Sequence, residues 1–141
     1  MAYEIKRFPY DGTIDADGHV LEPPDLWENY LESKYLERAL RIKVDDEGFE
    51  YLEINGKPSE RTNRGYPGTL GGMGNDDMRP SKERRYADNI PYGACNAAER
   101  ISMLEQENLQ KTLLYPTLGL LWECELTDPE LSLAYVRAYN R

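Results

Sequence analysis

The sequence predicts an α/β fold in which parallel strands alternate with helices, and three observations favour it. Residues 12–20 alternate with a period of two, and a one-sided helical pattern follows over 26–40. A run at 112–115 is apolar on both faces, as expected of a buried parallel strand covered by helices. Another helical pattern then begins after Thr127. Such alternation is typical of parallel strands joined by right-handed crossovers.

The first strand is predicted to have two chemically different faces. Its apolar and small face carries Ile14, Ala16 and Gly18, and its polar face carries Asp15, Asp17 and His19. Pro23 and Pro24 stop the strand, and Asp25 is placed to cap the helix that follows.

The middle of the chain divides into two stretches. Residues 42–60 predict a small β excursion with a tight hairpin, because Asn55-Gly56 accepts the positive φ angles of a type I′ turn. Residues 61–95 are rich in Gly, Pro, Asn and charge, which predicts a long loop inserted between elements. A loop of this length is usually either functional or mobile.

Regular structure is predicted to return near the carboxyl end. Asn96 is placed to cap a helix of about three turns that starts at Ala97. The sequence Thr127-Asp128-Pro129-Glu130 opens a last helix with a cap, an early proline and an early acid. Its buried stripe is predicted to be Leu131, Ala134, Tyr135 and Ala138. We expect this helix to reach Arg141 without a Gly, Asn or Pro that closes it.

Composition narrows the classes of function. The 141 residues allow one domain, and 17 Lys and Arg against 26 Asp and Glu give a net charge of −9. The negative electrostatic field of a chain with this charge repels nucleic acids and anionic membrane surfaces. No window resembles a membrane span or a secretory signal, which predicts a cytoplasmic protein. Cys95 and Cys124 follow no metal-binding spacing and are expected to be two reduced thiols.

Asp17 and His19 form the candidate metal-binding pair. They lie two residues apart on the predicted strand, so their side chains leave one face and can converge on one ion. A carboxylate and a neutral imidazole suit Zn²⁺ or a related divalent ion, and Gly18 leaves room behind the strand. Spacing alone is a weak signal for metal binding and favours a solvated strand end. Since His19 is the only histidine, the chain lacks the usual three ligands of a His-rich catalytic zinc site.

Two long segments resemble a known family. They are IDADGHVLEPPDLWENYLESKYLERA near the start and AAERISMLEQENLQKTLLYPTLGLLWECELTDPELSLAYVRAYNR at the end. Both are similar to the amino-terminal part of the amidohydrolase-related family that includes the aminocarboxymuconate-semialdehyde and resorcylate decarboxylases. The resemblance leaves mainly residues 45–95 unaccounted for.

The resemblance implies an incomplete (β/α)₈ TIM barrel, in which residues 1–141 supply the first two β/α units and the metal lies at the carboxyl ends of the strands. Asp17 and His19 occupy the family's first-strand ligand positions. Because members commonly carry His-x-His or Glu-x-His there, Asp17 is a departure, and Asp15 is a second carboxylate that can substitute or support it. The family's remaining ligands have no counterpart in this sequence.

The leading interpretation is the amino-terminal part of a divalent-metal-dependent hydrolase or non-oxidative decarboxylase. Its substrate is a small molecule that bears a carboxylate, and the chain is expected to be inactive alone. The alternative is a short non-catalytic protein that docks onto a partner, a full-length barrel or a complementary half, and covers its open strand edges. A self-sufficient α/β binding module is the third interpretation, and a homo-oligomer is a further possible assembly.

Four other features favour structural roles. Glu22 is interpreted as a dipole partner of the helix after Pro23-Pro24, and Trp27 with the tyrosines as core. The glycines at 65–74 lack the Lys-Ser/Thr of a phosphate loop and are interpreted as flexible. The basic group Arg79, Lys82, Arg84 and Arg85 is interpreted as a solvated loop face, although an arginine there can also recognise a substrate carboxylate.

Overall fold

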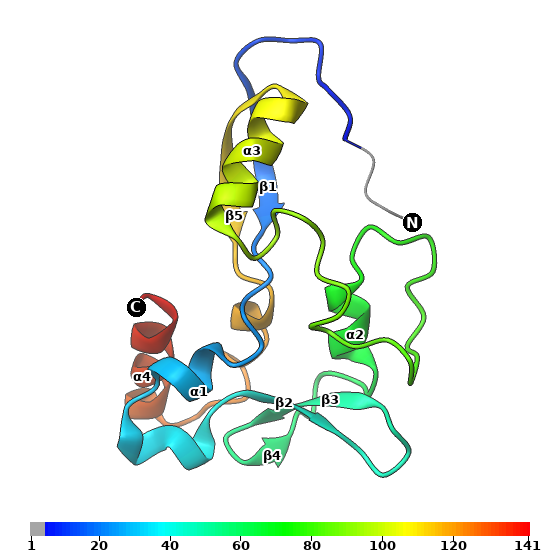
Figure 1. Cartoon of the computed structure of the whole chain (residues 1–141). Helices are drawn as coiled ribbons and strands as arrows, with labels where there is room; N and C mark the ends of the chain where they lie inside the picture. The colour runs from blue at the N-terminus through cyan, green and yellow to red at the C-terminus, as the bar shows by residue number, and fades with distance from the viewer. Residues whose placement is uncertain (1–4) are drawn as a thin grey trace.

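The fold is a mixed α/β arrangement with one parallel and one antiparallel sheet, in a computed structural model that describes residues 5–141. The parallel sheet pairs β1 (Thr13–His19) with β5 (Leu109–Tyr115). The antiparallel sheet contains β2 (Arg41–Val44), β3 (Glu50–Ile54) and β4 (Lys57–Pro58). Figure 1 shows the parallel pair and α3 (Ala97–Glu107) projecting from the part of the molecule that holds the antiparallel sheet.

The hydrophobic core lies in the lower part of Figure 1, where α1 (Leu26–Tyr30) packs against α4 (Pro129–Tyr139). The aromatic ring of Trp27 is fully buried there, with the rings of Tyr135 and Tyr139 at centroid distances of 6.1 and 6.2 Å. The core interpretation of Trp27 is therefore confirmed. The four residues of the predicted stripe on α4 are also buried.

Two of the three predicted side-chain caps form, whereas Asp25, the N-cap of α1, makes no side-chain capping hydrogen bond. The Asn96 side chain accepts hydrogen bonds from the backbone N–H groups of Ala98 and Glu99 at the start of α3. Asp128 accepts from Glu130 and Leu131 at the start of α4. These bonds satisfy N–H groups that a helix leaves unpaired at its first turn. The expectation that α4 lacks a closing residue is wrong, because Asn140 is its C-cap and donates a backbone hydrogen bond to Val136.

The helix predicted over 26–40 is interrupted. Only α1 is α-helical, and after an extended Leu31 the chain continues as the 3₁₀ helix η1 (Ser33–Arg38). The interruption leaves Trp27, Leu31 and Tyr35 all buried, so packing of the core overrides the helical pattern. The interpretation of the tyrosines as core is wrong for Tyr10 and Tyr30, which are 74% and 47% exposed.

The predicted β excursion is confirmed and has three strands. Asn55 and Gly56 join β3 to β4 with φ angles of 55° and 73°, the positive values that a type I′ turn requires. The predicted structureless stretch 61–95 is corrected in part, because α2 (Tyr66–Gly71) forms within it.

The glycines of this segment provide close packing as well as turns. A Cβ on Gly68 would lie 2.3 Å from the carbonyl oxygen of Arg84, and one on Gly71 would lie 2.3 Å from that of Tyr86. These distances admit only glycine, so α2 lies directly against the backbone of the returning chain. Their interpretation as flexible residues is therefore wrong for Gly68 and Gly71.

The parallel pair differs from the predicted buried sheet. β5 runs parallel to β1, as expected, but it begins three residues earlier than the apolar run. Leu113 and Leu114 are 54% and 45% exposed, and Ile14 on β1 is 57% exposed. Within residues 5–141 the sheet has two strands, so each has one edge without a partner strand. Parallel sheets are normally covered on both faces, and this one is not.

Candidate metal-binding site

His19 is the last residue of β1 and lies beside the end of β5. It pairs in register with Tyr115, and the N–H of Val20 donates to the Tyr115 carbonyl at 3.0 Å. Because parallel strands end at the same edge of a sheet, the segments that follow the two strands meet there. The Nδ1 atom of His19 lies 3.0 Å from the hydroxyl oxygen of Thr117, which follows β5.

A bulge interrupts the alternation of β1 before His19 is reached. Asp15 pairs with Thr112 and Gly18 pairs with Leu114, so three steps on β1 match two on β5. The N–H of Asp17 turns back to the Asp15 carboxylate at 3.1 Å, and the Thr112 hydroxyl donates to the same carboxylate at 2.9 Å.

Glycine is the only residue type that fits at position 18, inside this bulge. A Cβ there would lie 2.3 Å from the Thr112 hydroxyl oxygen and 2.7 Å from the Asp15 carboxylate. Residues 15 and 18 therefore face the same side at the bulge, which corrects the prediction that Gly18 and Asp15 lie on opposite faces of the strand. The room that Gly18 was predicted to leave is occupied by the Asp15–Thr112 pair.

A cavity of about 260 Å³ lies between β1, α3 and the 61–95 segment. It is lined by Asp15, His19, Leu21, Met73, Pro91, Tyr92, Ala94, Arg100, Met103 and Glu107. Four of these residues come from the segment predicted as a long loop. The cavity thus combines two carboxylates, an imidazole and a guanidinium with apolar walls, as small-molecule sites commonly do.

The two predicted ligands are placed differently. His19 is partly buried and lines the cavity, whereas Asp17 is exposed and is not among the lining residues. Within residues 5–141, no group of three His, Cys, Asp or Glu side chains lies close enough to hold a metal ion. The described donors have suitable chemistry but do not by themselves form a complete metal site.

Glu22 is a residue whose role sequence reasoning assigned wrongly. Its side chain is buried, and its carboxylate accepts the backbone N–H groups of Thr117, Leu118 and Gly119 at 2.9, 2.9 and 3.0 Å. These groups open the 3₁₀ turn η2 (Leu118–Leu120), not the helix after Pro24. No local signal predicts this contact, because its partners lie more than 90 residues away in the chain.

Two tyrosines, Tyr86 and Tyr139, lie near Glu22 and keep their hydroxyl protons. The Tyr86 hydroxyl donates to the Glu22 carbonyl at 2.8 Å. Burial raises the pKa of Tyr86 and raises that of Tyr139 to about 12, and the nearby Glu22 carboxylate adds to both shifts. Both phenols therefore stay neutral at pH 7, so neither adds a second negative charge beside Glu22.

Arg100 is a second residue that the sequence did not reveal as part of the site. It lies on α3, and its guanidinium donates to the His19 carbonyl at 2.5 Å. Arg100, Met103 and Glu107 follow helical spacing and line the cavity, whereas Ile101 on the same helix is 60% exposed. The helical spacing of these three residues was the signal available in the sequence.

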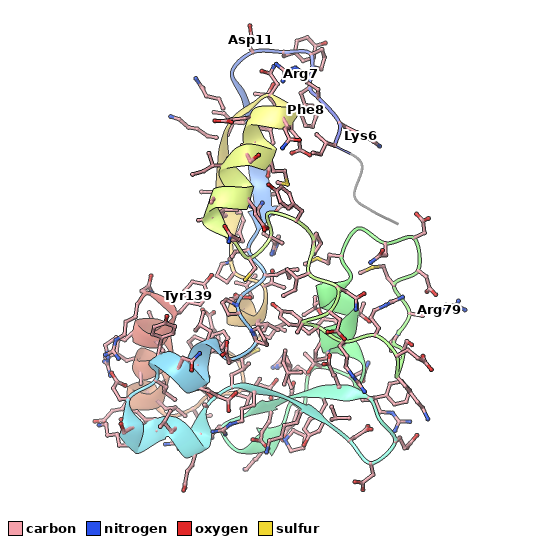
Figure 2. All side chains as sticks on the ribbon, in the orientation of Figure 1. Lys6, Arg7, Phe8, Asp11, Arg79 and Tyr139 are labelled. Atoms are coloured by element: carbon pink, nitrogen blue, oxygen red, sulfur yellow. The ribbon has the colours of Figure 1, made fainter. Side chains whose placement is uncertain are left out.

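The remaining charged and sulfur-bearing candidates lie away from the cavity. Arg79 pairs with Asp77 and points away from the molecule, as Figure 2 shows. None of the four residues of the basic group lines the cavity, and Arg85 donates to the Gly48 carbonyl. Cys95 and Cys124 are both free, which confirms the expectation of two thiols.

The comparisons with known proteins show the fold. The chain is similar to the crystal structure of an amidohydrolase from Mycobacterium avium subsp. paratuberculosis K-10, with a TM-score of 0.64 and 24% identity. The match covers 92% of this chain and 37% of that one, so the chain spans little more than a third of the amidohydrolase. No protein-family model and no curated protein matches the sequence. In residues 5–141, no helix is long and apolar enough to cross a membrane.

Proposed function

We propose that this chain supplies the first-strand half of a divalent-metal site, with Zn²⁺ the best fit, in an amidohydrolase-type (β/α)₈ barrel. The supporting observation is the position of His19, at the carboxyl end of a parallel strand and on the wall of the cavity, within a fold that matches part of an amidohydrolase. Barrel enzymes keep their chemistry at this end of their strands.

Asp17 and His19 are the ligands that this proposal assigns, with Asp15 as a supporting carboxylate. Asp15 is already held by Thr112 and by the N–H of Asp17, so it can fix the backbone between the two ligands. A divalent ion in such a site lowers the pKa of bound water or polarises a substrate carbonyl or carboxylate. Residues outside this chain would supply the other ligands.

The reaction class proposed is hydrolysis or non-oxidative decarboxylation of a small carboxylate-bearing substrate, in the cytoplasm. The cavity volume of about 260 Å³ suits a small molecule, and Arg100 brings positive charge to its wall. Because the described residues hold no three-ligand cluster, we propose that the chain has no turnover by itself.

A second candidate function is non-catalytic docking onto a partner, either a complementary barrel chain or a second copy of this one. The exposed Ile14, Leu113 and Leu114 and the two open edges of the parallel sheet favour it. Docking alone requires no metal ligand, so replacement of Asp17 or His19 distinguishes the two functions.

Zinc titration of the full chain tests the catalytic proposal. We expect one weak site, far below the roughly 10–16 kcal/mol of closed structural zinc sites. His19→Gln should abolish binding and Asp17→Asn should weaken it at least about tenfold, because each removes a ligand. The exposed Asp46→Asn is the matched control and should leave binding unchanged. Isothermal calorimetry measures all four proteins, and equal affinities would refute the assignment and favour docking.

A further inference from the structure

Glu22 connects the end of β1 to the segment after β5 through backbone hydrogen bonds. Its side chain is 1% exposed and is not part of the cavity wall, so it does not touch a ligand there. One carboxylate oxygen accepts from Thr117 and Gly119, and the other accepts from Leu118. A carboxylate that accepts three amides fixes the position of the segment that carries them.

Thr117 contacts both Glu22 and His19, and so links the two side chains. Its backbone N–H is held by Glu22, and its hydroxyl oxygen lies 3.0 Å from His19 Nδ1. Thr117 is 5% exposed, and His19 is half-buried. Among the described residues, the Thr117 hydroxyl is the hydrogen-bond partner of the His19 ring. Since Thr117 occupies Nδ1, any metal bound by His19 must use Nε2.

We propose that Glu22 is a positioning residue that acts through Thr117 to hold the His19 proton on Nδ1. A neutral imidazole has one protonated nitrogen, and the partner of that nitrogen decides which one remains a ligand. With Nδ1–H donating to the Thr117 hydroxyl, the Nε2 lone pair is available. The use of Nε2 as a metal ligand rests on the proposed function, whereas the tautomer itself is a property of the metal-free chain.

Gly119 lies in close contact with the Glu22 carboxylate. A Cβ at residue 119 would lie 3.1 Å from Glu22 Oε1 and 2.8 Å from the Cβ of Pro116. The Glu22 carboxylate therefore approaches the backbone at a position where only glycine leaves room. Gly119→Ala is a second way to disturb the same contact without changing the carboxylate.

Nitrogen-15 NMR of the metal-free full chain tests the proposal. His19 is the only histidine, so its two ring nitrogens give unambiguous signals. At about two pH units above the ordinary histidine pKa, we expect Nδ1–H to predominate. Thr117→Val removes the acceptor and should transfer most of the population to Nε2–H, the tautomer that free imidazole side chains prefer. Thr117→Ser keeps a hydroxyl and should retain Nδ1–H.

The Glu22 variants separate positioning from general destabilisation. Glu22→Gln replaces one carboxylate oxygen by an amide N–H₂, a donor that cannot accept from the backbone N–H groups. It should therefore shift the tautomer population toward Nε2–H, as Thr117→Val does. Glu50→Gln is the matched control, because Glu50 is a buried carboxylate that accepts one backbone N–H, from Tyr86. It should leave the His19 tautomer unchanged. If Glu22→Gln does not fold, Gly119→Ala takes its place.

Predominant Nε2–H in the unmodified chain would overturn the proposal. So would an unchanged tautomer in Thr117→Val, or equal spectra for the Glu22 and Glu50 variants. The zinc titration is independent of these results. An Nδ1–H tautomer without zinc binding would refute the metal site alone, and zinc binding with an Nε2–H tautomer would refute the positioning role alone.

Discussion

Trp27→Ala is expected to remove a large share of the stability of the folded chain. The side chain is fully buried and contacts the rings of Tyr135 and Tyr139, so the variant leaves a large cavity between α1 and α4. Replacing a buried tryptophan by alanine costs about 3–5 kcal/mol. A small domain has a total stability of about 5–15 kcal/mol, so the loss is a large share of it.

Urea denaturation followed by circular dichroism measures this effect. The control is Tyr10→Ala, because Tyr10 is 74% exposed and its removal should change the free energy of unfolding by less than about 0.5 kcal/mol. Similar transitions for the two variants would show that the α1–α4 contact is not the centre of the core.

Glu22→Ala is expected to have the second largest effect. The three backbone N–H groups of residues 117–119 lose their acceptor while they remain buried. Each unsatisfied buried group costs about 1–3 kcal/mol, although water that enters the space reduces the sum. We therefore expect a destabilisation of at least about 3 kcal/mol.

The exposed Glu60→Ala is the control for Glu22→Ala, with an expected change below about 0.5 kcal/mol. Thermal and urea unfolding of both variants provide the measurement. An effect for Glu22→Ala as small as that of Glu60→Ala would mean that the 117–119 amides find other acceptors, and the connection between the strand ends would then be incidental.

The sequence predicts the elements whose signals are local. Asn96 and Asp128 cap their helices through side chains placed two or three residues before their partners. Asn55-Gly56 forms its turn because the two residues tolerate positive φ. Each of these features needs only a few consecutive residues, so a single sequence contains the information.

The sequence does not predict features that depend on distant chain segments. α2 forms because Gly68 and Gly71 lie against the backbone of residues 84–86, which no local pattern reveals. The break at Leu31 likewise follows from core packing and not from a helix-breaking residue.

The candidate site also combines features that local sequence predicts with features that depend on distant segments. The Asp17-x-His19 pair is a local pattern, and the structure places His19 at the strand end that the pattern predicts. The bulge depends on the pairing of Asp15 with Thr112, and the Glu22 contacts depend on residues 117–119. Long-range partners therefore determine which side each carboxylate faces, and the assignment of Asp17 as a ligand stays a prediction.

The central claim is that β1 and β5 are adjacent strands of a larger sheet, and amide hydrogen exchange of this chain tests it most directly. The pair has two open edges and exposed apolar residues, whereas α4 packs in the core. Amides that join β1 to β5 should therefore exchange at least about tenfold faster than those in the middle of α4. Equal protection of the two regions would contradict the claim, because it would show that the two-stranded sheet is stable without further strands.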